Sequence, residues 1–192
     1  MMDRPSSSVS SDKEVCARFS KAYELLKEDG HDPQAIELLQ KNVLKNCTSS
    51  IVLLGDVYSQ GDETERKESI KLFRKAAALG DSSGMRNLGY CYAVGINVER
   101  DKEEGARWYT ESAEAGNARA MCNIGVMYDF GNGVPQDRDK AFGWYLRSAQ
   151  GGCTRGMTNL GEFYLYGKGT ERDLDEAERW FRESNSPRAI YH

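Results

Sequence analysis

The sequence lacks the features that would indicate a membrane protein or a hydrolytic enzyme. No run of apolar residues approaches the roughly 18 residues that a membrane-spanning helix needs. The only histidines, His31 and His192, lie towards opposite ends of the chain and do not offer the base that a nucleophilic serine or cysteine needs beside it. Carboxylates are plentiful, but they fall in helix-capping positions and in charged runs typical of a solvated surface. We therefore predict a protein that is not an enzyme and has no membrane partner.

The five cysteines lack the spacing of a disulfide framework or of a metal site. Their number is odd, and the sequence contains no Cys-x-x-Cys pair and no cluster of cysteine with histidine. The segment 1–11 is polar and serine-rich, without the apolar stretch of a secretory signal peptide. We therefore expect reduced thiols, a cytoplasmic location and no bound metal.

The net charge is small, because 26 basic residues nearly balance 30 acidic ones. A net charge of -4 argues against a broad basic surface for nucleic acid. No phosphate-binding glycine motif occurs, since the Gly-x-Gly strings have neither a third glycine nor a strand before them. The sequence therefore predicts no nucleic-acid partner and no cofactor.

Glycine, in contrast, is abundant and periodic, with 19 residues against four prolines. A Leu/Ile-Gly-x-x-Tyr string occurs four times, and the intervals between its glycines are 34, 36 and 36 residues. We call these the marker glycines: Gly55, Gly89, Gly125 and Gly161. Three tryptophans follow with the same 36-residue period, at Trp108, Trp144 and Trp180. Such regularity indicates four copies of one structural repeat.

Each copy has the pattern of two helices, A and B. In the third copy Asn117 is a suitable N-cap for helix A, and Ala120, Ile124 and Tyr128 form one apolar stripe. A glycine-rich turn at residues 131–135 ends that helix, and Asp137 can cap helix B. In the second and fourth copies a Glu three residues after the cap Asp predicts a capping box. A helix pair of this size cannot bury its apolar stripe alone, so consecutive pairs must stack.

These residues resemble the Sel1-like repeat, a relative of the tetratricopeptide repeat. The third copy matches nearly the whole pattern, including Asn123, Gly131, Gly133, Val134 and Asp137, whereas the first copy has a short charged loop. The resemblance covers about residues 48–184, divided as 48–81, 82–117, 118–153 and 154–184. It implies an all-α fold, a right-handed α/α solenoid of stacked helix-turn-helix repeats. It also implies a role in complex assembly, signalling or quality-control degradation.

The two ends of the chain depart from the repeat. We expect residues 1–11 to be a disordered tail and residues 12–47 to form a capping helix pair or a degenerate repeat, with Asp32 and Pro33 starting its second helix. Residues 185–192 form a C-terminal tail or a partial cap. A poorly capped C-terminal edge would allow copies of the chain to associate.

The residues that recur at the same position in several copies of the repeat favour a structural interpretation. The tryptophans are expected in the packing between helices rather than in a ligand ladder. Asn87, Asn123 and Asn159, one residue before the Leu/Ile of the last three copies, are expected to hydrogen-bond between neighbouring helices rather than to hold a ligand. Function is therefore sought on the concave face of the A helices. The candidate partner-binding residues are Arg86, Tyr90, Arg119, Val126, Phe130, Arg155, Glu162 and Tyr166.

The predicted function is that of a non-catalytic scaffold or adaptor that binds a peptide or helix. The arginines would orient a protein partner through its acidic groups, and exposed aromatic side chains would add anchors. Two alternatives stay open. One is a hydrolase of the β-lactam-binding kind described for cysteine-rich relatives, although the paired cysteines of those relatives are missing here. The other is a self-assembling structural solenoid.

Overall fold

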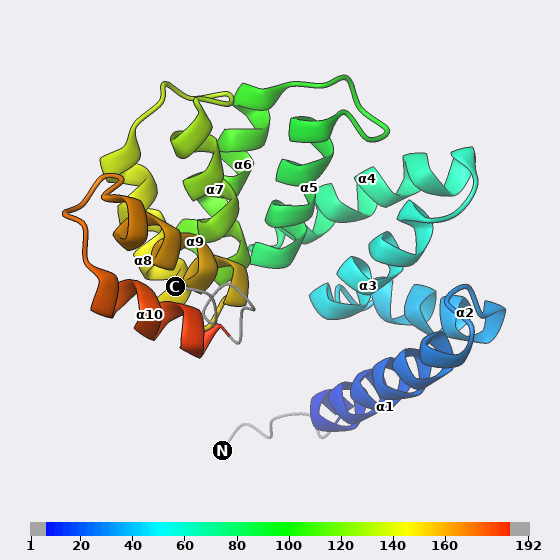
Figure 1. The fold of residues 1–192 in the computed structure, drawn as a ribbon. Coiled ribbons are helices and arrows are strands. Elements are labelled where there is room, and N and C mark those ends of the chain that lie inside the picture. Colours follow the sequence, from blue (N-terminus) through cyan, green and yellow to red (C-terminus); the bar gives the residue numbers. More distant parts are fainter. Residues whose placement is uncertain (1–6, 185–192) are drawn as a thin grey trace, which may run out of the picture. The chain divides into compact units, whose positions relative to one another are not determined.

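The computed structural model describes residues 7–184, and all regular elements in this range are helices (Figure 1). The chain divides into two compact units at Gly84. The first unit contains α1 (Ser7–Glu28), α2 (Pro33–Val43), α3 (Thr48–Ser59) and α4 (Glu63–Ala78). The second unit contains most of α5 (Ser82–Val94), then α6 (Lys102–Glu114), α7 (Ala118–Phe130), α8 (Arg138–Gln150), α9 (Thr154–Tyr166) and α10 (Leu174–Glu183). The all-α repeat architecture predicted from the sequence is confirmed.

The N-terminal helix begins earlier than expected. Helix α1 starts at Ser7, whereas the sequence pattern predicted disorder through residue 11. No proline or glycine interrupts residues 7–28, so nothing in the backbone prevents the helix from extending into the serine-rich segment. Residues 1–6 and the C-terminal segment 185–192, with its predicted tail or cap, lie outside the described residues.

In the first unit α1 and α2 pack against each other, and α2 packs against α3. Asp32 caps α2 by accepting a hydrogen bond from the Ala35 backbone N–H at 2.8 Å, with Pro33 in the first turn, as the sequence predicted. The amide of the buried Asn42 donates to Val15 O at 2.9 Å and to Ser50 Oγ at 3.0 Å. The buried core of this unit contains Ala22, Ala35, Leu39, Ile51, Leu54, Leu72 and Ala76.

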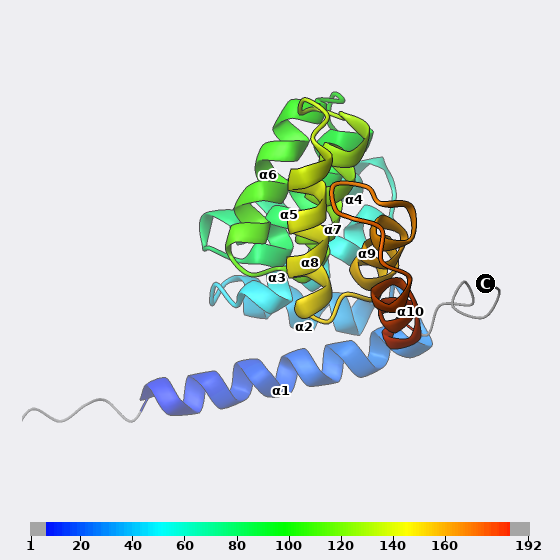
Figure 2. The same cartoon turned by 60° about the vertical axis from the view of Figure 1, so that its left-hand side comes forward.

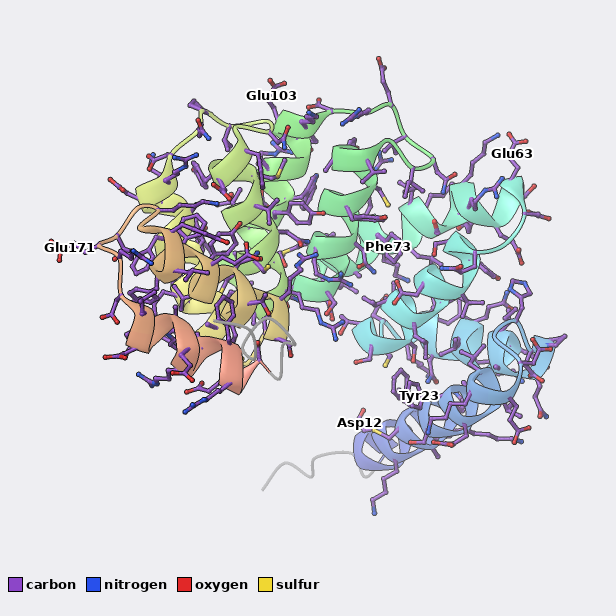
Figure 3. All side chains as sticks on the ribbon, in the orientation of Figure 1. Asp12, Tyr23, Glu63, Phe73, Glu103 and Glu171 are labelled. Carbon is purple, nitrogen blue, oxygen red and sulfur yellow. The ribbon has the colours of Figure 1, made fainter. Side chains whose placement is uncertain are left out.

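The marker glycines allow an aromatic ring of helix B to lie directly on the backbone of helix A. A Cβ atom placed on Gly125 would lie 2.8 Å from Tyr145 Cδ1, and one on Gly55 would lie 2.5 Å from Phe73 Cε1. Figure 3 labels Phe73 on α4. The other two pairs are Gly89 with Tyr109 and Gly161 with Phe181. All four repeats therefore share one glycine–aromatic joint, which no larger residue at the marker position would permit without displacing the ring.

The tryptophans pack less centrally than the sequence predicted. Trp180 is buried, but Trp108 and Trp144 are only half-buried. The aromatic residue after each tryptophan is the one that occupies the joint, and Tyr145 is 1% exposed. Trp144 packs at the margin of the apolar cluster that contains Ile124, so its contribution to packing between helices is confirmed. The main aromatic contact of each repeat is therefore one residue further along the chain.

The ends of the helices follow the predicted capping pattern with one exception. Aspartates 101, 137 and 173 cap α6, α8 and α10, and Gly131 and Gly167 end α7 and α9 in the left-handed conformation. A complete capping box occurs at Asp62 and Glu65 of the first repeat. The boxes predicted in the second and fourth repeats are wrong, because the Glu104 and Glu176 carboxylates pair instead with arginines of their own helices, and Glu104 also accepts a bond from the indole of Trp108.

In the third and fourth repeats, the loop between helices A and B packs against the B helix of the preceding repeat. In the third repeat a Cβ atom on Gly133 would lie 2.2 Å from the Lys102 carbonyl oxygen at the start of α6. In the fourth repeat Gly169 approaches the Arg138 carbonyl oxygen at the start of α8 in the same way. Both glycines have a positive φ, so conformation and space each favour glycine. Figure 2 shows these helices from a second direction.

Candidate functional site

Three arginines from successive repeats line one cavity of about 400 Å³ in the second unit. Arg86 lies on α5, and Arg119 and Arg155 are the second residues of α7 and α9. Helices α7 and α9 pack against each other (Figure 1), and residues of both first turns line the cavity. We call this site the basic cleft, and its lining residues are Arg86, Tyr90, Arg119, Asn123, Gly152, Cys153, Thr154 and Arg155.

The positive charge of the basic cleft is not neutralised by a carboxylate among the described residues. Arg155 donates to Cys122 Sγ through Nε at 3.1 Å and to the side-chain oxygen of Asn123 through Nη2. Arg86 donates to Asn87 Oδ1 at 2.6 Å. All of these acceptors are hydrogen-bonding groups of neighbouring side chains, and none is Asp or Glu. Three guanidinium groups without a carboxylate partner among the described residues give the cleft a net positive potential, which favours an anionic ligand.

A second, more apolar cavity of about 290 Å³ adjoins the basic cleft. The two cavities share Tyr90, Asn123 and Arg155. We call the second cavity the apolar recess, and its remaining lining residues are Ala93, Val94, Arg100, Lys102, Tyr109, Val126, Met127 and Asn132. Burial raises the pKa of the Tyr109 phenol, against the opposing effect of the nearby Arg86 and Arg155 charges. The phenol is therefore a neutral hydrogen-bonding group in this recess.

The structure brings together five of the eight predicted partner-binding residues. Arg86, Tyr90, Arg119 and Arg155 line the basic cleft, and Val126 lines the adjoining recess together with Tyr90 and Arg155. The other three, Phe130, Glu162 and Tyr166, do not line either cavity. Phe130 and Tyr166 are the last residues of α7 and α9 and are 67% and 63% exposed. Their role in binding stays a prediction.

Sequence reasoning missed several residues of the cleft. Asn123 was expected to form a structural bond between helices, and its bond with Arg155 confirms this, but the same side chain also lines both cavities. Asn159 likewise bridges helices by donating to Cys122 Sγ at 3.6 Å. Cys153 and Thr154 immediately precede Arg155 at the start of α9, so proximity to a predicted arginine was the available signal.

Among residues 7–184, no group of three or more potential metal ligands occurs. In the same range, no helix combines the length and the hydrophobicity that a membrane span requires.

Comparison with known proteins places the chain among helical repeat proteins. A Sel1 repeat protein from Oxalobacter formigenes is 32% identical, with a TM-score of 0.80 over 89% of this chain and 72% of its own. The protective antigen c5321 of uropathogenic Escherichia coli, which displays an SLR fold, is 29% identical, with a TM-score of 0.77 over 92% of this chain and 39% of its own. The DAP3-binding cell death enhancer 1 of Rattus norvegicus is 29% identical over 73 residues, which are 38% of this chain and 14% of that protein.

The fold and these similarities define an α/α repeat protein. The family model of the Sel1 repeat matches residues 48–81, 82–117, 118–153 and 154–185, and the chain therefore belongs to the Sel1 repeat family. Sel1 repeats generally serve as protein-interaction scaffolds. The chain spans less than half the length of the rat and Escherichia coli relatives.

Proposed function

We propose that this protein is a non-catalytic scaffold that binds an acidic peptide segment of a partner protein in the basic cleft. The observation that carries the proposal is the convergence of Arg86, Arg119 and Arg155 in one cavity without a carboxylate partner among the described residues. A carboxylate held by guanidinium groups forms charge-assisted hydrogen bonds, which are stronger than neutral ones. The general role of Sel1 repeats in protein interaction and the protein-binding name of the rat relative support this assignment.

The adjoining recess indicates the composition of the peptide. Tyr90 and Arg155 border both cavities, so a ligand that occupies the cleft has an apolar surface beside its charged group. Val126 and Met127 supply that surface, and the Tyr109 phenol offers a hydrogen bond within it. The preferred segment therefore has an acidic residue next to a medium-sized apolar residue. The acidic residue would bind in the basic cleft, and the apolar residue would bind in the apolar recess.

The test compares two fluorescein-labelled peptides by fluorescence anisotropy. One contains Leu flanked by Asp and Glu, and the other carries Asn and Gln in place of the acidic residues. We expect the acidic peptide to bind at least about tenfold more tightly and to lose affinity with added salt, because its recognition is electrostatic. Equal affinity for the two peptides, or binding of neither, would contradict the proposal.

A charge-reversed variant locates the binding site. Arg119→Glu with Arg155→Glu places two negative charges in the cleft, and we expect it to abolish binding of the acidic peptide while circular dichroism stays unchanged. The matched control is Arg107→Glu with Arg147→Glu, which changes the net charge equally at exposed positions on α6 and α8 outside both cavities. If both double variants lose binding equally, the effect is one of overall charge and the cleft is not the site.

We further propose a cytoplasmic location, which agrees with the odd number of cysteines and the lack of a Cys-x-x-Cys pair in the sequence. The hydrolase and the self-assembling solenoid stay predictions from the sequence, and no feature of the described residues favours either one. Association through the C-terminal edge involves residues outside the described range.

A further inference from the structure

Two cysteines from the start and the end of the third repeat lie at the wall of the basic cleft. Cys122 lies on α7 and is fully buried, whereas the half-buried Cys153 is the N-cap residue of α9 and lines the cleft. Cys153 packs against the buried cluster that contains Cys122, and each thiol shifts the pKa of the other. One thiol is therefore reachable from the cavity, and the second lies directly behind it.

The surroundings of the pair favour one thiolate and one thiol. The hydrogen bond from Cys122 lowers the pKa of Cys153 to about 5, against the effect of burial and with help from the backbone amides of Gly156 and Arg155. The same hydrogen bond, together with burial, raises the pKa of the Cys122 thiol. Arg155 adds a positive charge beside the pair, with its Nε 3.1 Å from Cys122 Sγ. The reachable sulfur of Cys153 is thus the nucleophile.

We propose that Cys153 and Cys122 form a peroxide-reactive dithiol, which closes to a disulfide between α7 and the N-terminus of α9. In the first step the Cys153 thiolate attacks one oxygen of hydrogen peroxide. A sulfur–oxygen bond forms, the oxygen–oxygen bond breaks, and the hydroxide that leaves takes up a proton to become water. The product at Cys153 is a sulfenic acid.

In the second step Cys122 resolves the sulfenic acid. Its sulfur attacks the Cys153 sulfur, a disulfide bond forms, the sulfur–oxygen bond breaks, and hydroxide leaves as water with the proton of the Cys122 thiol. In sum, two thiols are oxidised to one disulfide, and one hydrogen peroxide is reduced to two waters. The buried position of Cys122 suits this second role, because it protects the thiol from direct oxidation.

Cys47 offers a matched comparison within the same chain. It is the N-cap of α3 and lies eight residues before marker Gly55, as Cys153 lies eight residues before Gly161. The Cys47 sulfur accepts a hydrogen bond from Ser50 Oγ at 3.3 Å, whereas Cys153 packs against the cluster that contains the second cysteine, Cys122. Cys47 and Cys153 therefore both lie at the N-terminus of a helix, and Cys153 also has a second cysteine, Cys122, beside it.

The first experiment needs no variant. The purified full chain is treated with less than one equivalent of hydrogen peroxide, blocked with N-ethylmaleimide, and mapped by tryptic mass spectrometry without reduction. We expect the first cross-linked product to join the Cys122 and Cys153 peptides, with Cys47 still blocked as a thiol. At pH 6 we also expect iodoacetamide to alkylate Cys153 about tenfold faster than Cys47. The reason is the high thiolate fraction of Cys153, which outweighs the weaker nucleophilicity of a thiolate with a low pKa.

Single variants then separate the two roles. In Cys122→Ala the reaction stops at a Cys153 sulfenic acid, which dimedone traps, and in Cys153→Ala the peroxide leaves Cys122 unmodified. Cys47→Ala is the control and forms the disulfide at the wild-type rate. A disulfide that joins another pair first, or equal peroxide reactivity of Cys47 and Cys153 in the wild-type chain, would overturn the proposal. Disulfide formation is measured without any peptide, so this outcome is separate from that of the binding experiment.

Discussion

The first and third repeats have the same central joint but different ends. In both, a marker glycine on helix A receives the aromatic ring of helix B, Phe73 on Gly55 and Tyr145 on Gly125. Helix α7 ends on Gly131 in the left-handed conformation, whereas α3 ends on Gln60 in the right-handed one. The comparison shows that the glycine–aromatic joint defines the repeat, while the loop that follows helix A can take more than one form.

The same two repeats also differ on the face of helix A. Six residues before the marker glycine, the third repeat carries Arg119 in the basic cleft and the first carries an exposed Ser49. Three residues before it, the third carries Cys122 and the first Val52. The positions that build the repeat are thus shared, and the positions that would bind or react are the ones that change.

The largest expected effect comes from removing the shared joint. Phe73→Ala and Tyr145→Ala should each lower the free energy of unfolding by about 3–5 kcal/mol, because each ring is almost completely buried. Trp144→Ala should cost less, about 1–2 kcal/mol, since this side chain is half-buried. Urea denaturation followed by circular dichroism measures all three. A greater loss for Trp144→Ala than for Tyr145→Ala would refute the order of importance inferred here.

A smaller effect is expected in the loop between helices A and B, which is longer in the third repeat than in the first. Gly133→Ala would place a Cβ atom against the Lys102 carbonyl oxygen in a backbone conformation with φ of 75°, so we expect a loss of about 2 kcal/mol. The control is Gly143→Ala in α8, where a Cβ atom would meet nothing within 4 Å. That variant should gain up to about 1 kcal/mol from helix propensity. Equal thermal midpoints for the two variants would show that the loop contact carries no stability.

The smallest effect is expected at the capping box of the first repeat. Asp62→Ala removes the bonds to the Thr64 and Glu65 amides and should cost about 1 kcal/mol. Glu65→Ala should cost a fraction of this, because its carboxylate accepts from the Asp62 amide at 3.1 Å. Glu104→Ala in the second repeat is the comparison, since Glu104 does not complete a capping box there. Thermal unfolding should show Asp62→Ala as the least stable of the three.

The sequence predicted most of the fold because the repeat is encoded by periodic residues. The four marker glycines, the cap aspartates and the helix-ending glycines recur at fixed intervals, and each has a local physical reason. The closeness of Arg119 and Arg155 was predictable for the same reason, since equal positions in stacked repeats line up, whereas Arg86 lies about one helical turn further along its own A helix.

The contact between Cys122 and Cys153 was not predictable in this way. It joins the middle of one A helix to the N-cap of the next, and the separation of 31 positions differs from the 36-residue period. The alternative partners of Glu104 are a second example, because the spacing of a capping box does not exclude a competing bond to Trp108. The early start of α1 is a third, since a serine-rich composition does not reveal whether a neighbouring helix extends into it.

The approach of Gly133 to Lys102, and of Gly169 to Arg138, has a consequence for how the second unit loses its structure. Each loop rests on the start of the B helix of the preceding repeat, so stability is shared between nearest neighbours rather than held in one central core. Amide protons of α10 should therefore exchange with solvent first and those of α6 later, as opening spreads inward from the last repeat. In the second unit, single glycines therefore form the contacts through which one repeat stabilises the next.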